Sequence, residues 1–152
     1  MIMLTIKSES ERVTRELGAK FAKILKPGMT VLLHGDLGTG KTVFTRGICE
    51  ALGAANCKSP SFTLINEYKA NNNLIIAHAD LYRLNTQAEV DALGLDDYID
   101  APDCVLIAEW PERNNFWPSK NLIKIYFAAL SESQREIKFD SDLNLDKILN
   151  SN

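Results

Sequence analysis

The sequence predicts an α/β fold with three layers and a mixed parallel and antiparallel sheet. Short apolar runs alternate with amphipathic segments in the first half of the chain, and further strand-like runs close the second half. Alternating strands and helices favour a parallel sheet covered by helices, while consecutive late strands favour antiparallel additions. A glycine-rich turn between the first buried run and a helical segment makes this a P-loop NTPase-like domain.

Length and composition are those of an ordinary globular domain. The chain has 152 residues, of which 45% are hydrophobic and 24% are charged. A chain of this length buries roughly 68–70% of its unfolded surface and needs no cross-links. We expect residues 1–152 to form one domain, with a polar tail after about residue 140 that frays.

Charge and hydropathy exclude several classes of protein. Seventeen basic residues stand against 20 acidic ones, for a net charge of −3, whereas a dominant nucleic-acid binder usually carries a basic face. The longest strictly apolar run, residues 125–130, is far shorter than the roughly 18 residues of a membrane span. Residues 1–5 lack the pattern of a secretory signal. We therefore expect a cytoplasmic protein that does not bind membranes.

The three cysteines, Cys49, Cys57 and Cys104, are odd in number and form no C-x-x-C pair. That spacing gives no indication of a zinc site. We expect reduced, partly buried thiols, as is usual for cytosolic proteins.

The first helix is expected over residues 8–25. Ser8 and Glu11 have the spacing of a capping box, and apolar residues then recur every four positions. Residues 31–33 predict a buried strand, and residues 41–52 predict a second helix that ends before Gly53.

The later elements follow from turn and capping signals. The three asparagines at 71–73 predict a turn between two antiparallel strands, and Thr86 with Glu89 predicts a second capping box. The expected elements in chain order are strands at 62–68 and 74–78, a helix at 86–93, a buried strand at 105–108, a loop at 111–118, and a hairpin of strands at 122–129 and 136–139.

Residues 35–42 read Gly-Asp-Leu-Gly-Thr-Gly-Lys-Thr and match the phosphate-loop pattern G-x-x-x-x-G-K-[ST] in full. The match lies between a predicted strand and a predicted helix, as that motif requires. Glycines let successive backbone N–H groups face a phosphate, and the helix start adds partial positive charge. The residues expected to bind the nucleotide here are Asp36, Leu37, Gly38, Thr39, Gly40, Lys41, Thr42 and Val43.

Two carboxylates at strand ends complete the candidate site. Lys41 is expected at the β- and γ-phosphates, and the Thr42 hydroxyl is the expected Mg²⁺ ligand. Asp80 and Glu109 each end a predicted strand. Either carboxylate can hold the metal while the other orients the attacking water. Glu109 fits the metal position better, because four apolar residues precede it directly. The candidate catalytic residues are therefore Lys41, Asp80 and Glu109.

The nucleotide base and the reaction class follow from what the sequence lacks. It has no Asn-Lys-x-Asp guanine-binding motif, and the D-x-x-G match at 91–94 falls at a predicted helix end. Adenine is therefore the expected base. Arg46, Arg83 and Arg113 are scattered, whereas a small-molecule kinase usually has an arginine-rich lid. A small-molecule kinase and a non-catalytic nucleotide-binding module remain the alternatives to an ATPase.

Four blocks in this order, at residues 35–42, 59–63, 78–84 and 109–112, resemble the TsaE (YjeE) family of bacterial P-loop ATPases. The resemblance extends from the first helix to about residue 137. It implies an accessory ATPase in the synthesis of threonylcarbamoyladenosine beside the anticodon of tRNA. The implied cofactors are ATP and Mg²⁺, and the implied partners are a TsaD-like transferase and a TsaB-like subunit, with tRNA contacted only indirectly.

The resemblance also implies roles for individual residues. Thr42 and Glu109 match the family's Mg²⁺ positions, Asp80 its second acidic motif, and Trp110 a tryptophan near the nucleotide. Residues 59–63 match a switch-like loop, and the start of the first helix matches the adenine end of the site. Hydrolysis would be slow and would reset the complex with the partners.

Two departures from the family pattern change side chains without removing backbone groups. Ser61 replaces a common threonine and Val43 a common hydroxyl residue. Three of the matched residues have structural as well as functional interpretations. His78 can be a buried core histidine, Arg83 a salt-bridge partner, and Trp110 an aromatic that packs locally rather than against nucleotide or a partner.

Overall fold

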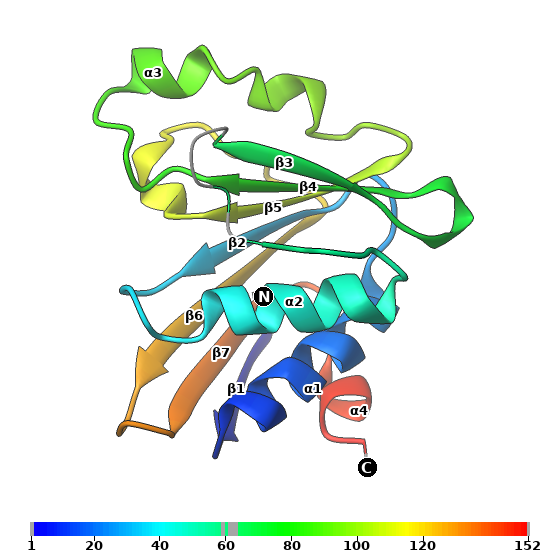
Figure 1. Ribbon diagram of the computed structural model, residues 1–152, viewed down its shortest axis with the longest axis vertical. Coiled ribbons are helices and arrows are strands. Elements are labelled where there is room, and N and C mark those ends of the chain that lie inside the picture. The colour runs from blue at the N-terminus through cyan, green and yellow to red at the C-terminus, as the bar shows by residue number, and fades with distance from the viewer. Residues whose placement is uncertain (1, 59, 61–63, 152) are drawn as a thin grey trace.

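A mixed sheet of seven strands forms the centre of the computed structural model, which describes residues 2–58, 60 and 64–151 (Figure 1). The order across the sheet is β1-β7-β6-β2-β5-β4-β3. The central pairs β6–β2, β2–β5 and β5–β4 are parallel, and the outer pairs are antiparallel. The strands are β1 (Ile2–Ser8), β2 (Thr30–His34), β3 (Ile65–Lys69), β4 (Ile75–Asp80), β5 (Cys104–Glu109), β6 (Leu122–Ala129) and β7 (Arg135–Ser141).

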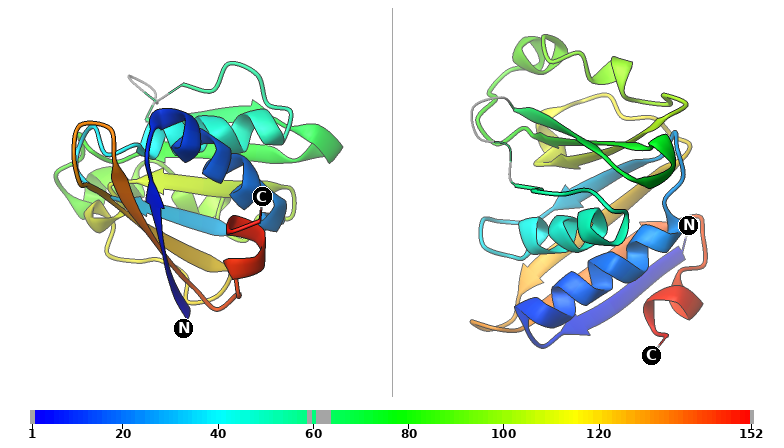
Figure 2. Two further views of the ribbon diagram at one scale, coloured as in Figure 1. Left: turned by 90° about the horizontal axis from the view of Figure 1, so that it is seen from below. Right: turned by 45° about the vertical axis from the view of Figure 1, so that its right-hand side comes forward.

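Helices cover both faces of the sheet, which confirms the expected fold class. Figure 2 shows α1 and α2 side by side over one face, while α3 and the short helix η3 pack over the other near β4 and β5. None of the described helices has the length and apolar character needed to cross a bilayer. The helices are α1 (Glu11–Phe21), α2 (Lys41–Ala51), α3 (Gln87–Asp91), α4 (Asp146–Leu149) and the 3₁₀ turns η1 (Ala22–Ile24), η2 (Asn71–Asn73), η3 (Leu95–Asp97) and η4 (Pro111–Arg113).

Residues of the central strands alternate between two cores. Val31 and Leu33 of β2 pack under α1 and α2, whereas Leu32 packs on the α3 side. Strands that are buried on both faces read as continuous apolar runs, which explains why β2 and β5 could be predicted from sequence. The parallel strands therefore form a rigid platform whose carboxyl ends meet at one edge.

Two glycines set the close approach of α1 and α2. A Cβ atom on Gly18 would lie 2.2 Å from the carbonyl oxygen of Phe44, and one on Gly47 would lie 2.0 Å from that of Arg15. A side chain at either position is incompatible with this packing, because core backbone does not yield by that much. The contact holds α2 against α1 and thereby fixes where α2 begins.

The expected start of the first helix at Ser8 is wrong. Ser8 ends β1, and Ser10 caps α1 by accepting a hydrogen bond of 3.2 Å from the backbone N–H of Val13. The Ser8 hydroxyl instead donates to the backbone carbonyl of Ser10 and lies 2.7 Å from the hydroxyl of Thr14. Strand β1 was not predicted, because its partner β7 lies at the other end of the chain.

The remaining elements agree with expectation except at their ends. The β3–β4 and β6–β7 pairs are antiparallel, as predicted. The predicted strand start at Phe62 lies outside the described residues. Thr86 caps α3 by accepting from the N–H of Glu89 at 3.2 Å, but α3 is shorter than predicted. The D-x-x-G match lies at the end of α3, where Gly94 is left-handed with φ 72°.

After residue 140 the described chain continues as regular structure as far as Leu149. Strand β7 continues to Ser141, and α4 follows beside α1 (Figure 1). Leu145 and Leu149 are buried in the main core. These two apolar residues, four positions apart, pack this short helix against the body of the protein together with the partly buried Ile148.

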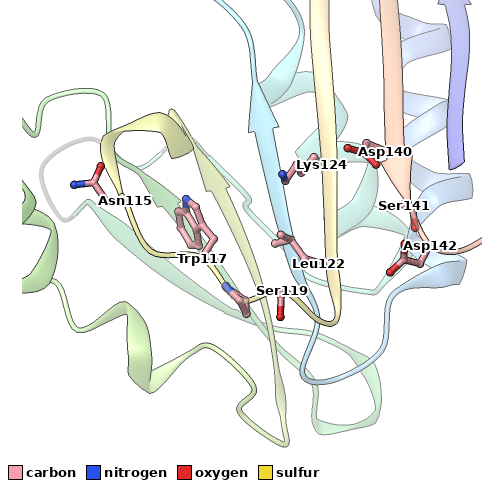
Figure 3. Close-up of a pocket in the computed structure, with 9 residues that line it drawn as sticks. Asn115, Trp117, Ser119, Leu122, Lys124, Asp140, Ser141 and Asp142 are labelled. Carbon is pink, nitrogen blue, oxygen red and sulfur yellow. The ribbon is translucent and has the colours of Figure 1, made fainter. Parts of the chain in front are cut away.

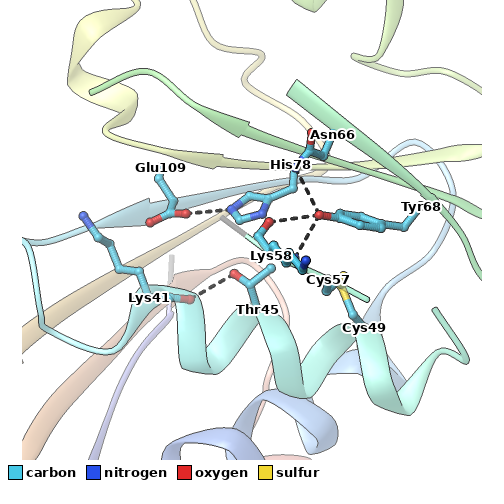
Figure 4. Close-up of a disulfide and its surroundings, with 9 residues drawn as sticks. All are labelled: Lys41, Thr45, Cys49, Cys57, Lys58, Asn66, Tyr68, His78 and Glu109. Carbon is cyan, nitrogen blue, oxygen red and sulfur yellow. Dashed lines mark hydrogen bonds and ion pairs between the residues drawn. A yellow bond between two sulfur atoms is a disulfide. The ribbon is translucent and has the colours of Figure 1, made fainter. Parts of the chain in front are cut away.

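The expectation of three reduced cysteines is also wrong. Cys49 of α2 forms a disulfide with Cys57, eight residues later (Figure 4). The chain reverses after α2, where the N–H of Ala54 donates to the carbonyl of Cys49 at 2.8 Å, and this reversal brings the two sulfur atoms together. In the chain-entropy view, closing such a short loop contributes about 2–3 kcal/mol. Cys104 is a buried free thiol.

We predict that thiol titration will find one reactive cysteine in the unfolded, unreduced protein and three after reduction. In the native protein Cys104 should not react, because it is 3% exposed and burial raises the pKa of its thiol to about 11. The measurement is a colorimetric thiol assay at pH 8 with and without denaturant and reductant. Three reactive thiols in unfolded protein that has never been reduced would contradict the disulfide.

Candidate functional site

The turn between β2 and α2 has the backbone geometry of an anion-binding loop. Gly35, Gly38 and Gly40 have φ of 144°, 76° and 102°, values that favour glycine. A Cβ on Gly35 would lie 2.6 Å from the carbonyl oxygen of Phe127. The Thr39 hydroxyl donates to the carbonyl of Asp36 at 2.7 Å and braces the loop from within. The loop is therefore a fixed turn that ends at the first residue of α2.

A cavity of ≈ 470 Å³ lies beside this turn, within the size range of ligand pockets. It joins the loop to the start of α1, where the adenine end is predicted, and to the β6–β7 hairpin. Its lining consists of Ser10, Glu11, Thr14, Gly38, Gly40, Val43, Glu132, Ser133 and Arg135.

Arg135 is a residue of this site that the sequence did not indicate. Its guanidinium donates to the carbonyl of Gly38 in the loop at 3.0 Å. It also donates to the backbone carbonyls of Ser131, Glu132 and Gln134. The hairpin is thereby tied to the phosphate loop across 97 residues of chain. No local spacing could have predicted this contact.

Lys41, the first residue of α2, is 4% exposed. Its ammonium donates to the carbonyl of Gly35 and lies 4.3 Å from the ring centroid of Trp110. Burial lowers the pKa of Lys41, and the nearby carboxylates, led by Glu109 and then Asp80, oppose this shift. The cation therefore lies at the loop, between an aromatic face and two carboxylates.

Asp80 and Glu109, the two predicted strand-end carboxylates, are direct neighbours in the β4–β5 register. Glu109 is buried, and its backbone carbonyl accepts from the N–H of Leu81 at 3.1 Å. Asp80 accepts from the N–H of Tyr82 at 3.0 Å. Burial raises the pKa of Asp80 above its ordinary value, although the Tyr82 N–H opposes the shift. The sheet thus brings two carboxylates together opposite Lys41.

His78 contacts one of these carboxylates. Its Nε2 lies 2.7 Å from Oε2 of Glu109, and the side chains are 1% and 5% exposed (Figure 4). From the sequence, both a structural and a functional role were possible for His78. The structure places it directly behind the candidate metal ligand.

Trp110 follows Glu109 in a left-handed conformation with φ 56°. Its ring lies 4.9 Å from that of Tyr82, between centroids, and faces the Lys41 ammonium. Trp110 therefore lies beside the phosphate loop, and its contact with a nucleotide stays a prediction. Residues 59 and 61–63 of the predicted switch loop, Ser61 included, lie outside the described residues.

Few protein groups are available to hold a cation. Across residues 2–58, 60 and 64–151, no three His, Cys, Asp or Glu side chains gather into a metal site. Thr42 lies in the first turn of α2, the helix that begins at the loop. Mg²⁺ keeps several water ligands and needs few protein ligands. One hydroxyl and one carboxylate therefore suit Mg²⁺ better than a metal ion whose ligands all come from the protein.

A second cavity, of ≈ 380 Å³, lies away from this site (Figure 3). It is lined by residues from the loop after β5, from the start of β6 and from the end of β7. Since β6 runs parallel to β2, its start is at the opposite end of the sheet from the phosphate loop. The cavity contains none of the predicted site residues.

Comparison with known proteins gives one consistent description. The family model described as "Threonylcarbamoyl adenosine biosynthesis protein TsaE" matches residues 8–137. The tRNA threonylcarbamoyladenosine biosynthesis protein TsaE of Rickettsia conorii is 38% identical over 135 residues, which cover 88% of this chain and 74% of that protein. The protein of the same name from Bacillus subtilis is 36% identical over 136 residues, covering 89% and 82%.

A solved structure supports the same relationship. The crystal structure of YdiB from Bacillus subtilis matches with a TM-score of 0.71 and 31% sequence identity. The match covers 97% of this chain and 91% of that one. The α/β fold expected from the sequence is therefore the fold of a known relative.

We predict that Asp80→Asn will stabilise the protein at neutral pH. The pKa of Asp80 in the folded state lies above the ordinary 3.8, so the folded state keeps this proton to a higher pH than the unfolded state does. At a pH above both pKa values, the ionised Asp80 therefore lowers the free energy of unfolding. Asparagine carries no charge and keeps an acceptor for the Tyr82 N–H. Urea unfolding at several pH values should show a gain at pH 7 that disappears below about pH 4. A gain that does not change with pH would contradict this origin.

Proposed function

This chain belongs to the TsaE family, and we propose that it binds ATP with Mg²⁺ and hydrolyses the nucleotide slowly. In this proposal it is an accessory, regulatory subunit of the complex that forms threonylcarbamoyladenosine next to the anticodon of tRNA. The observation that carries the proposal is a complete phosphate loop placed opposite two strand-end carboxylates in adjacent register. Family membership supports the pathway, and the site supports the chemistry.

The phosphates would lie in the turn between β2 and α2. The backbone N–H groups of residues 36–43 and the start of α2 supply positive potential for an anion. The Lys41 ammonium adds a full charge, which its low exposure makes more effective than a charge in water. Trp110 places an aromatic face beside the same ammonium. Nucleotide phosphates are the ligand that this combination favours.

Mg²⁺ would be held by the Thr42 hydroxyl and the Glu109 carboxylate. Both are hard oxygen donors, which suit this cation. Only one oxygen of the Glu109 carboxylate is engaged by His78, so the group keeps coordinating capacity. When bound, the cation neutralises charge that develops on the phosphate oxygens.

In the hydrolysis that we propose, Asp80 orients the attacking water while Lys41 stabilises charge on the transferred phosphoryl group. Water takes the phosphoryl group, and ADP leaves. An arginine supplied by a partner can be worth about 10³–10⁵ in rate. A low basal rate in the isolated chain is therefore physically reasonable if assembly completes the site.

The partners we propose are a TsaD-like transferase and a TsaB-like subunit in the cytoplasm, and hydrolysis would reset their complex. The net charge of −3 argues against a dominant contact with tRNA, so that contact would be indirect. The segment at residues 59–63 would act as the switch that responds to the γ-phosphate.

We predict that Lys41→Ala will weaken ATP binding or turnover, because it removes the charge that faces the phosphates. Glu109→Ala should reduce hydrolysis more than binding, by about 10²–10³ in rate. Calorimetry measures binding and phosphate release measures turnover. Lys120→Ala is the matched control, since Lys120 is exposed and lines a cavity that contains no predicted site residue.

The same assays separate the alternatives. Transfer of labelled phosphate to a small acceptor rather than to water would indicate a kinase. Binding of ATP with negligible hydrolysis that neither variant changes would indicate a non-catalytic module. Absence of ATP binding by the unmodified protein would overturn the proposed function.

We predict that the isolated chain hydrolyses ATP much more slowly than the chain assembled with its partners. Affinity capture from the source cell with ATP present should recover the transferase and its companion subunit. Turnover in the reconstituted complex should exceed that of the isolated chain by tenfold or more, and a supplied arginine can raise it by as much as about 10³–10⁵. Equal rates would contradict activation by assembly.

A further inference from the structure

His78 and Glu109 meet because of the register between two parallel strands. His78 of β4 is paired with Ile107 of β5, so Glu109 lies one step further along β5 on the same face of the sheet. The imidazole Nε2 reaches the Glu109 carboxylate at 2.7 Å. A carboxylate that binds Mg²⁺, as the proposed function has Glu109 do, only accepts hydrogen bonds, so Nε2 is assigned as the donor in this pair.

Burial makes this hydrogen bond consequential. The two side chains are 1% and 5% exposed, so bulk water does not replace the bond if it is lost. A buried carboxylate without a donor is costly. The other ring nitrogen of His78, Nδ1, has no hydrogen-bond partner among the described residues. Within those residues, the imidazole therefore makes its hydrogen bond to Glu109.

Packing alone does not account for a histidine at this position. Ile76 and Ile107, which share its face of the sheet, are fully buried members of the main core. An apolar side chain at position 78 would fill the same layer without burying a ring nitrogen that finds no partner among the described residues. The imidazole is therefore explained by what it does to Glu109.

We propose that His78 is a positioning residue that holds the Glu109 carboxylate in its working orientation. The bond to Oε2 leaves the other oxygen on the side of Lys41 (Figure 4), where the proposed function places the metal and the phosphates. This inference rests on that proposed function. Hydrogen-bonding partners behind a metal ligand commonly change metal affinity or activity by about 10–100-fold when removed.

His78→Leu removes the donor while keeping an apolar side chain in the core. The expected result is a kcat lower by about 10–100-fold and a similar increase in the Mg²⁺ concentration needed for tight binding of ADP. At saturating Mg²⁺ the KM for ATP should change little, since the loop and Lys41 are untouched. Phosphate release gives the kinetic constants, and calorimetric titration of Mg²⁺ into the protein with ADP gives a readout independent of turnover.

A pair of amide variants tests the hydrogen bond itself and covers the case in which His78→Leu does not fold. His78→Gln places an amide N–H near the position of Nε2 and should recover kcat and Mg²⁺ dependence to within about threefold. His78→Asn is shorter by one carbon, cannot reach Glu109, and should behave like the leucine variant. Equal behaviour of the two amide variants would overturn the proposal.

Two controls isolate the contact. Ile76→Val loosens the same core layer without touching Glu109 and should leave kcat and Mg²⁺ dependence unchanged. In a Glu109→Gln background, His78→Asn should have no further effect, because the carboxylate through which it acts is gone. An additive loss in that background would overturn the positioning role.

Failure of this inference differs from failure of the proposed function. If the unmodified protein hydrolyses ATP and the histidine variants match it, only the role of His78 is overturned. If the unmodified protein binds no Mg²⁺ and nucleotide, the proposed function fails and the role of His78 fails with it.

Discussion

The candidate site depends on the way the backbone passes from β2 into α2. Gly35 and Gly40 adopt positive φ, so the chain reverses and α2 begins with Lys41 already inside the turn. The angle of α2 is held by its close contact with α1, where Gly18 and Gly47 leave no room for side chains. The loop is thus a stiff element between a buried strand and a locked helix, and stiffness is what an anion site made of backbone N–H groups requires.

The parallel order of β2, β5 and β4 supplies the other half of the site. Parallel strands end at the same edge, so the phosphate loop, Glu109 and Asp80 meet there without any of them being near in sequence. This is the arrangement by which open α/β sheets usually form ligand sites. The pairs that flank this core are antiparallel, and they extend the sheet until β7 can bring Arg135 to the loop.

Buried charge distinguishes this edge from the rest of the core. Lys41 and Glu109 are largely withdrawn from water, and burial shifts the pKa of Lys41 down and that of Asp80 up. Such groups cost stability unless each finds a partner. The Trp110 face, the His78 imidazole and backbone groups are those partners. This free-energy cost of burying charged groups is consistent with residues that serve binding and chemistry rather than the stability of the fold.

Local patterns explain how much of this could be predicted. The loop at 35–42, the strands β2 and β5 and the helix α2 were all evident from spacing and apolar runs, because each depends on neighbouring residues. The start of α1 was misplaced by two residues because Ser8 and Ser10 both suit a cap, and only pairing of β1 with β7 assigns Ser8 to the strand. Helix α4 was not predicted, because the burial of Leu145 and Leu149 depends on its contact with α1.

The sequence by itself determined the class of fold, the phosphate loop and the candidate residues Lys41, Asp80 and Glu109, since a motif of short spacing and a run of buried residues carry that information locally. Only the tertiary structure decided which distant groups meet. The His78–Glu109 bond spans 31 residues and the Arg135–Gly38 bond spans 97, and the Cys49–Cys57 disulfide depends on the chain reversal after α2. Strand order, register and reversals of the backbone create these contacts, and no periodicity along one segment encodes them.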